Sequence, residues 1–131
     1  MTPFVIYIAG PLSDMPAQYL ANVSRMASEA RWCMEQGWVP INPAADLIEG
    51  LMSGEALPLE AYQRRSLELL RLAALAEHRA IYVTELNHAD GRESIGVRAE
   101  IDEAVRLDVP IAFSRSKLKL LAAAYGVEVV A

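Results

Sequence analysis

The sequence has a single cysteine and lacks the short motifs that mark several common enzyme classes. Because Cys33 is alone, no disulfide or cysteine metal site can form within one chain, and we expect a reduced, packed thiol. The chain contains no P-loop and no His-Glu-x-x-His, Cys-x-x-Cys or Gly-x-Ser-x-Gly motif. His88 lies in a polar loop without a second histidine or a cysteine nearby, so we expect neither a metal ion nor another cofactor.

Basic residues and long apolar segments are also scarce. Lysine and arginine total 12 against 17 acidic residues, which gives a net charge of −5 at pH 7 and argues against a nucleic-acid polymer as partner. No apolar run approaches the roughly 20 residues that a membrane-spanning helix requires. The N-terminus lacks a basic region followed by an apolar segment, as a secretory signal would have. We therefore expect a cytoplasmic protein with no membrane partner.

The 131 residues, 53% of them hydrophobic, are enough for one domain with a sizeable core, which we place at residues 1–131. Apolar periodicity alternates between strand and helix, which predicts an α/β sandwich with a mainly parallel five-stranded sheet between two layers of helices. We expect strands at residues 4–9, 38–41, 80–83, 109–113 and 127–130. We expect helices at residues 16–36, 59–76, 94–107 and 115–124, and a loop with at most one helical turn at 44–58.

The most informative segment is residues 90–100, which follows the third expected strand and opens a helix. Ser94 suits the N-cap of that helix, and Gly96 removes a side chain from its first turn. Glu100 lies four residues later on nearly the same side, so its carboxylate can hang over the bare backbone at Gly96, near the positive end of the helix dipole. Two readings remain open, a functional carboxylate and an ordinary solvated glutamate. Glu100 borders the apolar stripe, and the position four residues later is Ala104 rather than a cation.

Other polar residues should meet Glu100, because the carboxyl ends of parallel strands share one edge of a sheet. A buried Tyr7 would need a hydrogen-bond partner, for which Glu100 is a candidate. Ser13 and Ser94 are each either a helix cap or an anion ligand. The remaining candidates at this edge are Gly10, Asn42, Asn87, His88, Asp90 and Arg92. Arg64, Arg65 and Arg71 are expected on a solvated helix face, pairing with Glu60 or Glu68.

Three segments in this order resemble a known family. Residues 6–11 (Ile-Tyr-Ile-Ala-Gly-Pro), residues 39–44 (Val-Pro-Ile-Asn-Pro-Ala) and the pattern Ser-x-Gly-x-x-x-Glu at 94–100 are similar to the nucleoside 2-deoxyribosyltransferase-like superfamily, in particular its DUF4406-type branch. The resemblance covers residues 4 to about 112. It implies a flavodoxin-like or Rossmann-like fold in a homo-oligomer.

The resemblance also implies a reaction and assigns residues to it. Glu100 would be the nucleophile on the anomeric carbon of a nucleoside sugar, and Tyr7 would orient it. Ser94 matches the serine that contacts the phosphate in the deoxynucleoside 5′-monophosphate N-glycosidases. Gly10, Ser13, Asn42, Arg92 and Gly96 would complete a site for a nucleoside or nucleotide, without a metal or cofactor.

The chain departs from this family where the leaving nucleobase is assisted. The family carries an acidic residue in a stretch like Arg-Asp-Leu, whereas this chain has Ser66 between Arg65 and Leu67. Glu68 is a nearby substitute for that acid. Three functions therefore stay open: an N-glycosidase or deoxyribosyltransferase-like enzyme, a non-catalytic nucleotide-binding module, and a purely structural or interaction protein.

Overall fold

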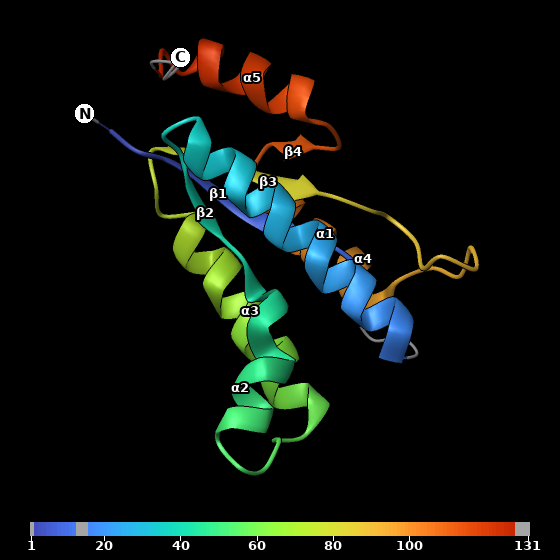
Figure 1. The fold of residues 1–131 in the computed structure, drawn as a ribbon. Helices are drawn as coiled ribbons and strands as arrows, with labels where there is room; N and C mark the ends of the chain where they lie inside the picture. Colours follow the sequence, from blue (N-terminus) through green and yellow to red (C-terminus); the bar gives the residue numbers. More distant parts are fainter. Residues whose placement is uncertain (1, 13–15, 128–131) are drawn as a thin grey trace.

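A computed structural model describes residues 2–12 and 16–127, with the side chain of residue 47 left out. Its sheet has four parallel strands in the order β2-β1-β3-β4 (Figure 1). The strands are β1 (Phe4–Ala9), β2 (Val39–Ile41), β3 (His78–Val83) and β4 (Ile111–Ala112). The predicted α/β class and parallel sheet are thus confirmed. The expected fifth strand at 127–130 falls almost entirely outside the described residues, and Val127 itself is not in a strand.

Helices cover both faces of the sheet, because side chains alternate along its central strand. Ile6 and Ile8 point to one core, which is covered by α1 (Pro16–Glu35) and α5 (Arg115–Ala124). Tyr7 and Ala9 point to the other core, which is covered by α3 (Leu59–Ala73) and α4 (Ile95–Arg106). The sheet is therefore buried on both sides, as the continuous apolar run of β1 predicts.

The segment after β2 is more helical than predicted. Instead of a loop, the chain forms a short 3-10 helix, η1 (Pro43–Ala45), followed by α2 (Asp46–Met52). The Asn42 side-chain oxygen accepts a hydrogen bond from the Ala44 backbone N–H at 3.1 Å and caps this start. Periodicity did not reveal α2 because its apolar residues Ile48, Leu51 and Met52 are exposed and form no buried stripe.

The other element ends differ from expectation by a few residues at most. α1 stops just before Gly37, which adopts φ +84°, the left-handed conformation typical of a helix stop. β4 spans two residues rather than five, and α3 ends at Ala73. Cys33 is buried and free, as expected, and burial raises the pKa of its thiol to about 12. Among the described residues, no helix is long and apolar enough to cross a membrane.

Candidate functional site

Glu100 points into the protein, against the central strand. Its Oε2 atom is buried and has no hydrogen-bond partner. Burial raises the pKa of the carboxyl to about 7, while the adjacent Tyr7 hydroxyl lowers the pKa and the negative charge of Asp46 raises it. The solvated alternative for Glu100 is therefore wrong, and the carboxyl can be neutral or ionised near pH 7.

Tyr7 supplies a hydroxyl to the same buried space. Its side chain, from the middle of β1, is fully buried, and its hydroxyl lies beside Glu100 and Ser66. Burial and then the Glu100 charge raise the pKa of Tyr7 far above its usual range, so the hydroxyl keeps its proton. No hydrogen bond of ordinary geometry is formed by this hydroxyl. The structure thus brings Tyr7 and Glu100 together, as expected, but leaves the donor and the acceptor unbonded.

Glu100 does not pack against Gly96. A Cβ added at Gly96 would meet nothing within 4 Å, so no Glu100 atom contacts that position. Glu100 turns toward β1 instead, because α4 packs its inner face on the core around Tyr7. The backbone of the first turn at Gly96 therefore faces open space, with its N–H groups at the positive end of the helix dipole.

Ser94 is the N-cap of α4, as predicted. Its hydroxyl oxygen accepts a hydrogen bond from the Val97 backbone N–H at 3.3 Å, and the residue is only 4% exposed. The hydroxyl proton is not used by this cap and can still be donated. Ser94 can therefore cap the helix and also donate a hydrogen bond to an anion.

The remaining predicted site residues have separate surroundings. Gly10 is buried on the α1 side, where a Cβ would lie 2.6 Å from Thr84 Oγ1 and 3.0 Å from Met26 Sδ. This close packing gives Gly10 a structural reason to be glycine. Arg92 pairs with Asp90 in an exposed loop, with 2.6 Å between Nε and Oδ2. Ser13 lies outside the described residues.

Asn42 borders a small cavity that sequence reasoning did not locate. The cavity has a volume of about 230 Å³. It is lined by Asn42, Pro43, Ala45, Asp46, Glu49, Arg65 and Leu69. A larger cavity of about 470 Å³ lies on the α1 side, between Gln18 and Arg25 and the loop after β3. The polar residues that were expected to meet at the strand ends thus border two separate cavities.

Asp46 is the site residue that the sequence analysis missed. Its negative charge acts on both Tyr7 and Glu100, and its side chain is only 15% exposed. Burial raises the pKa of the Asp46 carboxyl, whereas its ion pair with Arg65 lowers it. The sequence signal that could have revealed Asp46 is Asn42-Pro43 at the end of a strand. This pair is typical of a helix start, and Asp46 then lies in the first turn of α2.

Two expectations about α3 are corrected. Arg65 pairs with Asp46 and Glu49 rather than with a glutamate of its own helix. Glu68 pairs with Arg71, as expected, but on an exposed surface. Glu68 therefore does not replace the acidic residue that the family carries at the position of Ser66. A serine hydroxyl beside Tyr7 therefore stands where the resemblance implies a carboxylate.

Comparison of the chain with models of protein families, with curated proteins and with solved structures finds no match. A buried carboxylate that can ionise near pH 7, beside a protonated hydroxyl, can stabilise a developing positive charge or attack an electrophilic carbon.

Proposed function

We propose that this chain is an N-glycosidase or deoxyribosyltransferase-like enzyme that acts on a nucleoside or nucleoside 5′-monophosphate. The observation that supports the proposal is the inward Glu100 carboxyl, with its pKa raised to about 7 beside Tyr7. In this proposal the chain belongs to the nucleoside 2-deoxyribosyltransferase-like superfamily and has its flavodoxin-like fold, with a five-stranded sheet. The protein then works in the cytoplasm.

The proposed reaction has two steps. The ionised Glu100 carboxylate attacks the anomeric carbon, the C–N bond breaks, and its electron pair leaves with the nucleobase, which takes up a proton. Water then attacks the same carbon, loses a proton and releases Glu100, or a second base does so in a transfer. In the reacting complex the Tyr7 hydroxyl donates a hydrogen bond to one carboxylate oxygen, which leaves the other oxygen directed at the sugar.

A phosphate group of the substrate has a suitable place in front of α4. The first turn at Gly96 faces open space, and backbone N–H groups at a helix N-terminus bind anions. Ser94 and Ser13 add hydroxyl donors, and Arg92 adds positive charge. Asn42 completes the proposed cradle at the end of β2.

We also propose a homo-oligomer. Leu59 and Leu72 on α3 and Leu75 just after it are exposed, although this helix covers the core on its other side. Large apolar side chains gathered on one element are typical of a contact surface between subunits.

A non-catalytic nucleotide-binding module is the second candidate, and one observation favours it. Ser66 beside Tyr7 cannot supply the proton that a leaving base requires, and Glu68 is turned away toward Arg71. A protein with this site would bind the ligand and leave its glycosidic bond intact.

Base release separates the candidates. Pure protein is incubated with a panel of nucleosides and 5′-monophosphates, and free base is measured by chromatography alongside ligand-induced thermal shifts. We expect base release that is abolished by Glu100→Ala and retained by Asp102→Asn, an exposed carboxylate on the same helix. A thermal shift without release identifies the binding module, and neither signal with any ligand contradicts both candidates.

A further inference from the structure

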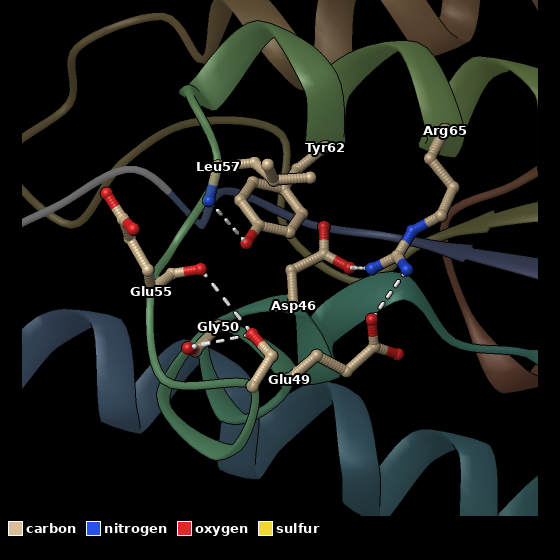
Figure 2. A network of polar contacts seen from close by, with 8 residues as sticks. Asp46, Glu49, Gly50, Glu55, Leu57, Tyr62 and Arg65 are labelled. Carbon is tan, nitrogen blue, oxygen red and sulfur yellow. Dashed lines mark hydrogen bonds and ion pairs between the residues drawn. The ribbon is translucent and has the colours of Figure 1, made fainter.

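The α2 and α3 helices are joined by a polar network in which Asp46 is mostly buried, whereas Arg65 and Glu49 are partly exposed (Figure 2). Arg65 reaches from α3 to α2, where one guanidinium nitrogen pairs with Asp46 and the other lies 2.5 Å from Glu49 Oε2. The guanidinium carbon also lies 5.6 Å from the centre of the Tyr62 ring. The Tyr62 hydroxyl accepts a hydrogen bond from the Leu57 backbone N–H at 3.1 Å, which ties the connecting loop to α3. The network therefore holds Asp46 in one place.

This network adjoins the Glu100 site. Ser66 follows Arg65 directly and places its hydroxyl beside Tyr7. Leu69, one turn after Arg65, lines the 230 Å³ cavity with Asp46 and packs against the core that contains Tyr7. The Asp46 carboxylate thus stands on the same side of the sheet as Glu100.

Within the described residues, the ionisable groups around Glu100 come from β1, α2 and α3. Tyr7 acts from β1 and Asp46 acts from α2. From α3, Arg71 bridges to Glu68 and to Glu103 of α4, so its charge is already balanced by carboxylates. Asp46 is therefore the charged side chain that acts on Glu100, and Arg65 reaches the site through its ion pair with Asp46.

Two carboxylates in one partly buried region oppose each other's ionisation, because low polarity strengthens like-charge repulsion. An arginine paired with one of them reduces this effect, since it offsets that carboxylate's charge. Glu49 shares the same guanidinium but is largely exposed, so water screens its charge.

We propose that Asp46 and Arg65 act as a positioning pair for Glu100, in which Arg65 holds Asp46 beside the site and partly cancels its charge, so that Glu100 can ionise. The effect of the pair on turnover rests on the proposed function, whereas its effect on the ionisation of Glu100 does not.

A carbon-13 NMR titration of the Glu100 carboxyl in the ligand-free protein tests the pair directly, with Glu100→Gln used to assign the signal. Asp46→Asn should lower the titration midpoint by about half a pH unit or more, because a neighbouring negative charge is removed. Arg65→Met should raise the midpoint, because the charge of Asp46 is then no longer offset. Arg65→Lys should have a midpoint close to that of the wild type, because the lysine restores a cation. Asp102→Asn on the exposed side of α4 is the matched control and should leave it nearly unchanged.

An unchanged midpoint in Asp46→Asn would overturn the proposal, as would an Arg65→Met midpoint equal to or below that of the wild type. If Arg65→Met does not fold, Asp46→Asn and Arg65→Lys still test the proposal. A titration midpoint of Glu100 in Arg65→Lys far from that of the wild type would also contradict it. In protein that releases base, the acidic limb of the kcat profile should move with the NMR midpoint. If the protein releases no base, only the proposed function is contradicted. The NMR titration then still tests the effect of Asp46 and Arg65 on the ionisation of Glu100.

Discussion

At the scale of single residues, Glu100 is the side chain on which the functional argument depends. A glutamate that is mostly removed from water keeps its proton more tightly, and here no arginine or lysine offsets that effect directly. Such a group opposes folding when it is ionised. A buried carboxyl with such a pKa is typical of a group that is used for chemistry near neutral pH.

Glu100→Gln should remove a pH dependence of stability. The pKa of Glu100 is about 7 in the folded protein and close to 4.5 in the unfolded chain, so the folded state binds the extra proton between these values. The contribution of Glu100 to stability is thus fully present below pH 4.5 and is lost as the pH rises through 7. The loss amounts to up to about 3 kcal/mol.

Urea unfolding at pH 5 and pH 8 checks this expectation. The Gln variant should match the wild type at pH 5 and exceed its free energy of unfolding at pH 8. Parallel pH dependences in the two proteins would show that Glu100 is solvated.

Tyr7→Phe should separate stability from function. The lost hydroxyl has no hydrogen bond of ordinary geometry, so the free energy of unfolding should change by less than about 1 kcal/mol. The hydroxyl lowers the pKa of Glu100, so its removal should raise that pKa above 7 and slow base release roughly 10- to 100-fold. Chemical unfolding and a pH–rate profile measure the two effects, and unaltered release would remove Tyr7 from the site.

At the scale of elements, the ends of β1 and α4 show two different uses of glycine. Gly10 lets the end of β1 pass close to Thr84 and Met26, so a methyl group has no room there. Gly96 has room for one, and its backbone conformation is not left-handed. The first glycine is explained by packing, whereas the second is explained by the open helix start proposed for the ligand.

Alanine substitutions should therefore act in opposite directions. Gly10→Ala should lower the free energy of unfolding by about 2 kcal/mol, because the Cβ overlaps its neighbours. Gly96→Ala should raise it by up to about 1 kcal/mol, because alanine favours helix. Thermal unfolding measures both changes, and ligand-induced thermal shifts should weaken in Gly96→Ala despite its higher stability. Undiminished shifts in that variant would argue against a ligand over Gly96.

At the scale of the whole molecule, the sheet separates two cores, and the candidate site lies on the α3–α4 side. The α2–α3 region projects away from the sheet (Figure 1). It carries exposed apolar residues. That region also carries Asp46, so a contact between subunits on α3 would adjoin the site.

Replacing Leu72 and Leu75 together with glutamate should dissociate the proposed oligomer, because charge is introduced into an apolar contact. Sedimentation should show a wild-type mass above the 14.4 kDa of one chain and a lower mass for this variant. Leu120→Glu on α5, where the leucine has an exposure between those of Leu72 and Leu75, is the control and should keep the wild-type mass. A wild-type protein of monomer mass would contradict the proposal.

Local pattern by itself determined most elements of this protein. The apolar run of β1, the helical stripe of α4 and the cap at Ser94 are short-range signals, since each depends on neighbours within one or two turns. The same signals placed Glu100 near Tyr7, because alternation along a strand and the period of a helix define which side chains face a shared core.

The tertiary structure alone decided the rest. Ile48, Leu51 and Met52 of α2 are exposed, so periodicity did not predict this helix. The ion pair between Arg65 and Asp46 joins residues 19 positions apart in sequence. Whether Glu100 leaned over Gly96 or toward β1 depended on how α4 packs against the sheet. Charge and burial act through space, so the ionisation of Glu100 follows from the packing that surrounds it and not from its place in the chain.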